Sequence, residues 1–321
     1  MKTNSKRRQT LKASLTLSAI ACCAVGAASA QLQGTWYNSY CSRVDLTVAG
    51  DVIQGVYTSH TGSTGSSYAV GQFDGSASGS GTDGTPFSMG VQWRLINDPV
   101  SQADGSWHWV SLFSGQYFPA QTISEPDQDP YDIPETLEIL NGLLATATVP
   151  GLNDTAPVLW PESLTFTKTP PAQCQPSTPG VPVSFTPTAV DNVSGTWTNA
   201  DGDELVLTLG PYIGEVSGTF TSSAGDEYDV LGRYDQIAPP QSGYTVAAQG
   251  ITLSLFDDSA SGGDPALKIF AGGVDYDKTS EMFLYVSDLQ STSWTDRFIQ
   301  QTLDKEIWTK QSGGGGPITR Q

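Results

Sequence analysis

The sequence predicts an all-β protein made of two related eight-stranded, antiparallel, up-and-down β-barrels in tandem. Three observations support this prediction. The pentapeptide Gly34–Asn38 returns in the middle of the chain as Gly195–Asn199, with only its fourth residue changed. Charged residues make up only 15% of the chain, whereas glycine, with 34 residues, is abundant. Apolar residues occur in short runs, many of them alternating with polar residues, which is typical of half-buried strands.

The two halves of the chain repeat one another in order. Further matches join Gly55–Ser59 to Gly218–Ser222, Gly71–Asp74 to Gly232–Asp235, and Phe166–Lys168 to Trp308–Lys310. The repeated unit is about 130 residues long, which is enough for a domain with its own core. The sequence therefore predicts two barrel domains, at residues 31–169 and 192–311.

Individual strands can be recognised within each repeat. Val44–Val48 and Glu204–Leu209 alternate apolar and polar residues, and Glu281–Val286 is rich in residues of high β propensity. Turn-forming segments such as Ala200–Asp203 separate these runs. A meander of about eight strands leaves no exposed edge when it closes into a barrel, so we expect closure.

Three further segments lie outside the two domains. Residues 1–30 resemble a signal peptide, with five basic residues, an apolar run and the A-x-A sequence Ala28–Ala30. Arg7 and Arg8 begin a stretch similar to the twin-arginine motif, so twin-arginine and general secretory export both fit. The proline-rich residues 170–191 predict a semi-rigid linker, and residues 312–321 predict a flexible tail. We expect a secreted or periplasmic protein with no membrane contact after signal cleavage.

Charge and cysteine content narrow the partners and the compartment. The formal net charge of −18 would repel nucleic acid and anionic membranes, so neither is an expected partner. Beyond residue 30 the chain has two cysteines, Cys41 and Cys174. The first and last strands of a closed barrel are neighbours, and we expect a disulfide between these cysteines in an oxidising compartment.

The sequence carries few signs of catalysis or metal binding. Its two histidines, His60 and His108, have no partners at metal-ligand or triad spacing. It contains no nucleophile-elbow, phosphate-loop or zinc motif, and nothing selects one carboxylate pair for glycoside hydrolysis. We predict a protein that is not an enzyme and uses no cofactor or metal.

The motifs of the first repeat, in their order, resemble the avidin and streptavidin family. The residues that carry the resemblance are Gly34–Asn38, Gly55–Ser59, Ser114–Tyr117 and Leu164–Lys168. The resemblance covers nearly all of the first repeat and, more loosely, the second. It implies a barrel with biotin bound in its mouth, as a ligand rather than a cofactor.

The resemblance also assigns roles to residues of the first repeat. It implies that polar residues surround the urea group of biotin, with the first three at the oxygen and the last at an N–H: Asn38, Ser42, Tyr57 and Ser59. It implies that others line the bicyclic ring and thioether or reach toward a neighbouring barrel: Trp93, Ser111, Phe113 and Trp160. Leu164 departs from the family, which places an aspartate there to accept a ureido N–H.

The second repeat departs further from the family pattern. The candidate biotin-binding residues there are Asn199, Ser222, Phe270, Trp294 and Glu306. Asp203 and Phe220 replace a serine and a tyrosine, and Ala248 is expected at the place of Trp93. We expect weak biotin binding, another ligand or a scaffolding role for this repeat.

Two functions fit these residues. The first is a secreted, non-catalytic biotin-binding protein whose first repeat is the better-preserved site. The alternative is a divergent avidin-fold module that binds another small molecule or serves as an adhesion or assembly scaffold. The resemblance also implies a homo-oligomer, in which a dimer of tandem chains brings four barrels together.

Overall fold

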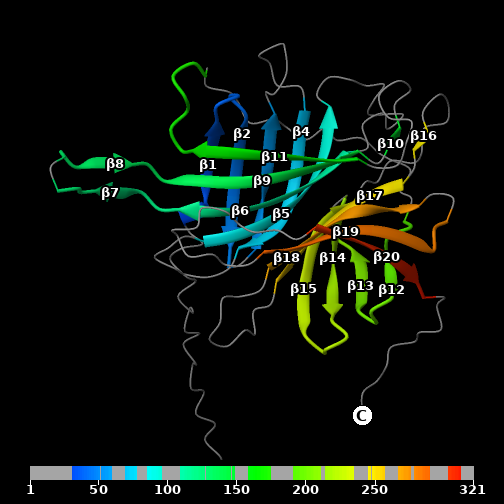
Figure 1. Cartoon of the computed structure of the whole chain (residues 1–321). Helices are drawn as coiled ribbons and strands as arrows, with labels where there is room; N and C mark the ends of the chain where they lie inside the picture. The colour runs from blue at the N-terminus through cyan, green and yellow to red at the C-terminus, as the bar shows by residue number, and fades with distance from the viewer. Residues whose placement is uncertain are drawn as a thin grey trace, which may run out of the picture.

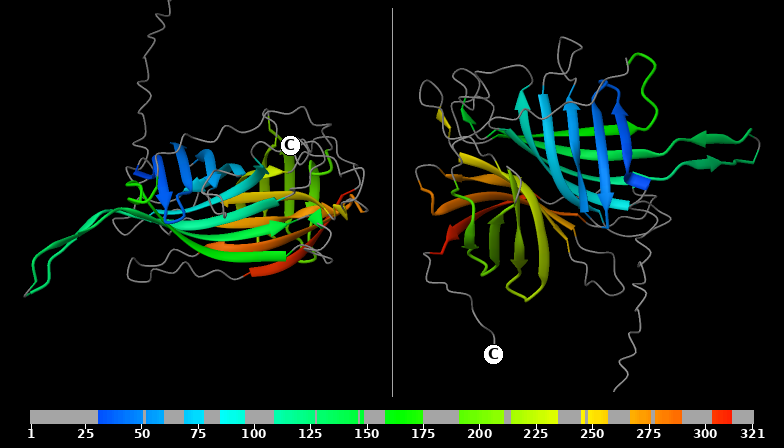
Figure 2. Two further views of the ribbon diagram at one scale, coloured as in Figure 1. Left: turned by 90° about the horizontal axis from the view of Figure 1, so that it is seen from above. Right: turned by 180° about the vertical axis from the view of Figure 1, so that it is seen from behind.

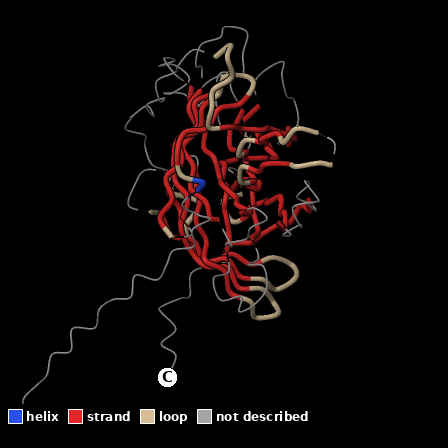
Figure 3. The backbone as a smooth tube through the Cα atoms, turned by 90° about the vertical axis from the view of Figure 1, so that its left-hand side faces the viewer, coloured by secondary structure: helices blue, strands red, loops and turns tan. Residues whose placement is uncertain are grey.

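The computed structural model of the chain is almost entirely β-sheet (Figure 3). It describes residues 31–50, 52–59, 69–77, 85–95, 109–126, 128–145, 147–148, 158–174, 191–210, 214–234, 245–246, 248–256, 267–275, 278–289 and 303–311. The all-β prediction is confirmed. The predicted signal peptide, most of the predicted linker, the tail, and both histidines lie outside these residues.

Eight strands of the N-terminal half close into a barrel, as predicted. They are β1 (Gly34–Asn38), β2 (Arg43–Ala49), β3 (Val52–Ser59), β4 (Ala69–Ala77), β5 (Thr85–Leu95), β6 (Trp109–Phe118), β9 (Thr136–Ala145) and β11 (Val158–Thr167). All neighbours are antiparallel, and β1 pairs with both β2 and β11, which completes the ring. Between β6 and β9, the hairpin of β7 (Gln121–Ile123) and β8 (Tyr131–Ile133) projects from the barrel (Figures 1 and 2).

The C-terminal half forms a second, barrel-like sheet. Its strands are β12 (Gly195–Thr198), β13 (Glu204–Leu209), β14 (Glu215–Thr221), β15 (Glu227–Tyr234), β17 (Ala248–Phe256), β18 (Leu267–Asp275), β19 (Glu281–Leu289) and β20 (Leu303–Lys310). β12 pairs with β13 on one side and with β20 on the other, so the strand order returns to its start. A short bridge between β10 (Ala147–Thr148) and β16 (Thr245–Val246) links the two halves.

The pairing registers correct one of the matches between the repeats. Ile53 lies opposite Gly75, and Val216 lies opposite Gly232. Ile53 and Val216 each precede the glycine of the Gly-x-x-x-Ser repeat by two residues, so Gly75, rather than Gly71, corresponds to Gly232. The predicted match of Gly71–Asp74 to Gly232–Asp235 is therefore wrong by four residues.

The same close approach of strands explains these two glycines. A Cβ atom at Gly75 would lie 2.0 Å from the carbonyl oxygen of Ser88. A Cβ atom at Gly232 would lie 2.0 Å from the carbonyl oxygen of Thr252. Neither position has room for a side chain, so both repeats need glycine where the fourth strand meets the fifth.

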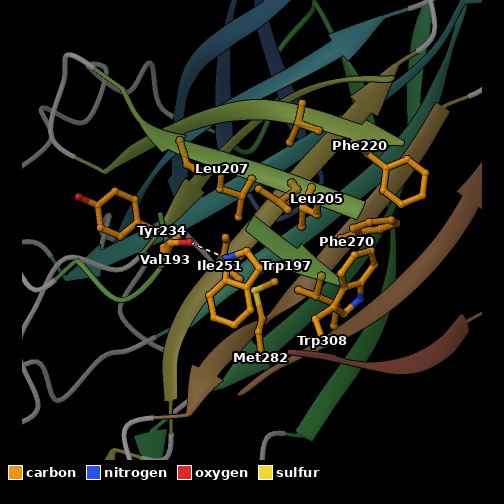
Figure 4. Packing of buried hydrophobic residues seen from close by; sticks show 14 of the residues in the cluster. Val193, Trp197, Leu205, Leu207, Phe220, Tyr234, Ile251, Phe270, Met282 and Trp308 are labelled. Atoms are coloured by element: carbon orange, nitrogen blue, oxygen red, sulfur yellow. Dashed lines mark hydrogen bonds between the residues drawn. The ribbon is translucent and has the colours of Figure 1, made fainter. Parts of the chain in front are cut away.

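Each half encloses its own apolar core, and a tryptophan of the first strand lies in it. Trp36 and Trp197 are fully buried, as expected for core residues. The indole N–H of Trp36 donates to the carbonyl of Leu32 at 2.8 Å, and Lys168 lies over its ring at 4.9 Å. The C-terminal sheet repeats this arrangement. The indole N–H of Trp197 donates to the carbonyl of Val193 at 2.8 Å (Figure 4), and Lys310 lies 5.1 Å from its ring.

The two halves pack face to face through equivalent strands. β4, β5 and β6 meet β15, β17 and β18. Ser88 shares a hydroxyl hydrogen bond with Ser254, and Gly90 lies against the Thr252 side chain. The corrected register makes Ser88 equivalent to Thr252 and Gly90 equivalent to Ser254. The two contacts are therefore reciprocal, as in an isologous two-fold dimer.

An apolar cluster completes this interface. Leu112 of β6 packs with Leu267, Ile269 and Ala271 of β18, and all four are buried. The single chain thus contains a pseudo-two-fold pair of sheets.

Among the described residues, no helix has the length and apolar character needed to cross a bilayer.

Candidate ligand-binding site

One end of the N-terminal barrel is built around Asn38. This residue ends β1, and its side-chain oxygen accepts the backbone N–H groups of Tyr40 at 3.1 Å and Ser42 at 2.9 Å. These bonds fix the orientation of the amide, because an oxygen must face the two donors. The opposite atom, Nδ2, is buried and has no hydrogen-bond partner. Asn38 is 2% exposed, so an unused donor faces the protein interior.

A disulfide holds the turn that follows Asn38. Cys41 has a positive φ of 65° and is bonded to Cys174, beyond the end of β11. The predicted disulfide is thus present, and it is of the kind found in oxidising compartments. A surface pocket beside this segment is lined by Asn38, Leu164 and Pro171, among other residues.

Three hydroxyl residues lie on the inner side of the barrel at this end. Ser42, Tyr57 and Ser59 are all buried. Arg43 lies opposite Thr58, so the next step of the ladder brings Ser42 beside Ser59. The structure therefore gathers the predicted Asn, Ser and Ser groups at one end, with Tyr57 one inward-facing position deeper on β3.

Aromatic rings form the wall below these polar groups. Tyr57 meets Trp93 and Phe113 edge to face, at centroid distances of 5.0 Å and 5.6 Å. The indole N–H of Trp93 donates to the hydroxyl of Ser111 at 2.8 Å. This bond links β5 to β6 and sets the orientation of the ring. Of the predicted wall residues, Trp93 and Phe113 therefore both contact Tyr57, and Ser111 is hydrogen-bonded to Trp93.

Two other predicted positions lie on β11. Leu164 is buried on the inner face, opposite Ile139 of β9. It offers no acceptor, as the sequence indicated. Trp160 lies opposite Leu143, and only its backbone is described.

The C-terminal sheet uses its equivalent asparagine differently. The oxygen of Asn199 accepts the N–H groups of Asp201 at 3.1 Å and Asp203 at 2.9 Å, in the geometry of Asn38. Its Nδ2, however, donates to the carboxylates of Asp203 at 2.9 Å and Glu306 at 3.0 Å. The donor that is unused in the first barrel is therefore engaged in the second sheet.

The carboxyl group of Glu306 is affected by its surroundings. Burial raises its pKa, the hydrogen bond from Asn199 opposes this, and the negative charge of Asp203 raises the pKa further. The net direction is upward, so the charged form is disfavoured. Leu164 precedes Phe166, the partner of Asn38, by two residues, and the pairing of Thr198 with Thr309 places Glu306 in the same relation to Asn199, so the two positions correspond.

The remaining residues of this second end differ from their counterparts. Phe220 and Phe270 pack at 5.7 Å, and the Lys268 ammonium lies 6.0 Å from the Phe220 ring (Figure 4 shows the two rings). Lys268 occupies the position of Ser111. Ser222 donates to Asp226 at 3.1 Å within its own hairpin turn. Lys268 and the carboxylates of Asp203 and Glu306 thus occupy positions that hold neutral residues in the first barrel.

The predicted equivalence of Ala248 and Trp93 is wrong. Leu253 lies opposite Gly232 as Met89 lies opposite Gly75, so the counterpart of Trp93 is position 257. That position and Trp294 lie outside the described residues. In the part of the chain that the structure describes, no group of three histidine, cysteine or carboxylate residues could hold a metal ion.

Sequence reasoning missed one inward-facing polar residue of the first barrel, Asn141. It follows Leu137 and Ile139 on the inner face of β9 and is buried. The sequence shows a polar residue within an apolar run, but the register of β9 decides which face of the strand it occupies. No family model matches the chain, and no curated protein is significantly similar to it.

Proposed function

We propose that this protein is an exported, non-catalytic biotin-binding protein made of two avidin-type barrels, with its ligand site in the N-terminal barrel. The observation that carries the proposal is the buried, unpartnered Nδ2 of Asn38. A buried donor without a partner costs about 1–3 kcal/mol, which a ligand acceptor would recover. The carbonyl oxygen of a urea is such an acceptor, and it carries partial negative charge.

The surroundings of Asn38 support a ligand that is part polar and part apolar. Hydroxyl groups lie at the mouth, and the rings of Tyr57, Trp93 and Phe113 lie beneath them. Small-molecule sites commonly combine an aromatic wall with a few fixed polar groups. Biotin has this division, with a urea on one edge and a thioether ring and alkyl chain elsewhere.

The second sheet is proposed to bind biotin weakly or not at all. Its Asn199 donor is already bonded to two carboxylates, and Lys268 lies over the aromatic ring of Phe220. A carboxylate beside a ureido oxygen would repel it. These differences are the ones that favour the alternative proposal, a divergent module for another small molecule or for assembly.

Export and assembly complete the proposal. The Cys41–Cys174 disulfide fits an oxidising, extracellular or periplasmic environment. Two chains are proposed to associate into a four-barrel assembly. The face formed by β4 to β6 is already covered within the chain, so this association uses other surfaces. Light scattering on the purified protein tests it, and the mass of a single chain would refute it.

Thermal unfolding with matched ligands tests the biotin proposal. A ligand that binds only the folded state raises the unfolding temperature as its concentration increases. We expect biotin to stabilise the exported chain. Lipoic acid has a similar acid chain and a sulfur ring but no urea, so it serves as the control. Equal stabilisation by both, or by neither, would contradict urea recognition.

A further inference from the structure

Two amide atoms inside the first barrel are buried without partners, and they are of opposite kinds. Nδ2 of Asn38 is a donor, and Oδ1 of Asn141 is an acceptor. Asn141 is 8% exposed, and its neighbours on the inner face, Ile139 and Leu143, belong to the apolar core or pack against it. Neither atom has a hydrogen-bond partner among the described residues.

The strand registers place these two residues on either side of Leu164. Asn38 lies opposite Phe166, which makes Leu164 its diagonal neighbour on β11. Asn141 lies opposite Glu162, which makes Leu164 its diagonal neighbour as well. Diagonal neighbours in antiparallel sheets lie about 7–8 Å apart, so long side chains and a small ligand can reach across. A donor and an acceptor therefore flank one apolar side chain.

Asn141 also adjoins the aromatic wall of the site. Phe113 lies directly opposite it on β6, and Phe113 packs against Tyr57. An acceptor at this place would meet the edge of a ring held against Phe113. One unused donor and one unused acceptor suit a ligand that carries both a carbonyl oxygen and an N–H, as a cyclic urea or a lactam does.

We propose that Asn141 is the acceptor for a ligand N–H in the first barrel, acting with the Asn38 donor to recognise a cyclic urea. This inference rests on the proposed biotin site for the identity of the ligand. It assigns to Asn141 the acceptor function that Leu164 cannot supply. The specificity of the site then depends on two amides from β1 and β9 rather than on a carboxylate of β11.

The test measures biotin affinity by calorimetry for the wild-type chain and a set of variants. Asn141→Leu removes both amide atoms at similar size, and we expect binding to weaken about tenfold or more. Asn141→Asp keeps an acceptor and should bind within about threefold of wild type. Leu164→Asp, added to Asn141→Leu, should restore most of the lost affinity. Denaturant unfolding confirms that each variant is folded.

The outcomes separate this inference from the proposed function. If wild type and Asn141→Leu bind biotin equally, Asn141 is not the acceptor, although the site stands. If wild type does not bind biotin, 2-imidazolidinone and ethylene carbonate serve as probes, because the carbonate replaces both N–H groups with oxygen. Preference for the urea that disappears in Asn141→Leu would support Asn141 without biotin. No preference, or no binding of either probe, would overturn the inference.

Discussion

Asn38 and Asn199 hold equivalent turns with their side-chain oxygens but differ at the other end of the amide. Each oxygen accepts two backbone N–H groups, at 2.9 Å and 3.1 Å. The nitrogen of Asn199 is bonded to two carboxylates, whereas that of Asn38 has no partner. The turn accounts for the oxygen in both cases, and the proposed ligand would account for the nitrogen of Asn38.

Asn38→Asp separates these two roles. An aspartate keeps an oxygen for the backbone N–H groups of the turn, so the fold should persist. It replaces the unused donor by an oxygen that repels a carbonyl, and biotin binding should weaken by more than about tenfold. The matched control is Asn199→Asp, which should leave biotin affinity unchanged. An Asn38→Asp protein that binds biotin normally would remove Asn38 from the site.

Gly90→Ala tests the packing of the two halves. An added Cβ atom would lie 2.2 Å from the Thr252 hydroxyl oxygen, so the interface must shift. We expect the free energy of unfolding to fall by about 1–3 kcal/mol, as for other overpacked sites. In a Thr252→Gly background the same change should cost much less. Chemical denaturation of the four proteins measures this, and equal costs in both backgrounds would contradict the contact.

Glu306 should make stability depend on pH. Its pKa is raised in the folded state, so the folded protein keeps a proton that the unfolded chain has lost. Stability should therefore decrease as pH rises from the ordinary glutamate pKa through the raised value. Glu306→Gln removes this charge, and its unfolding midpoint relative to wild type should rise across that pH window. A constant difference between the two proteins would show that Glu306 does not titrate in this way.

Loss of the disulfide should destabilise the first barrel. Cys41 and Cys174 are 133 residues apart, and their bond closes a long loop. Replacing both by serine should lower the free energy of unfolding by about 2–5 kcal/mol. A reductant should produce a similar loss in wild type and none in the double variant. Unchanged stability in the variant would mean that the strand pairing of β1 with β11 is sufficient alone.

The sequence was sufficient to predict the strands and the closure of the first barrel, but not every correspondence between repeats. The repeated segments around Trp36 and Trp197 were reliable because these tryptophans occupy the same buried place. The match at Gly71 failed because Gly71–Phe73 resembles Gly232–Tyr234 in sequence, whereas Gly75–Ala77, which occupies the equivalent place, has no aromatic residue. The correct match depends on which residues pair across neighbouring strands. Gly75 pairs with residues of β3 and β5, and the sequence alone does not show where those strands begin and end.

The interface and part of the site were also beyond sequence reasoning. Ser88, Gly90 and Thr252 look like ordinary strand residues, and only the approach of the two sheets makes their size important. Asn141 lies in an apolar run, where its inward direction depends on the register of β9. By contrast, Asn38 and Ser42 could be predicted because they belong to a motif in which local chain geometry brings them together.

Calorimetric titration of the exported chain with biotin is the direct test of ligand binding at Asn38. We expect a measurable binding heat with one site per chain, because the amide N–H of Asn38 is available to a ligand and that of Asn199 is bonded to Asp203 and Glu306. Two equivalent sites would show that the carboxylates around Asn199 do not block binding. The absence of any binding heat at millimolar biotin would contradict the proposed function.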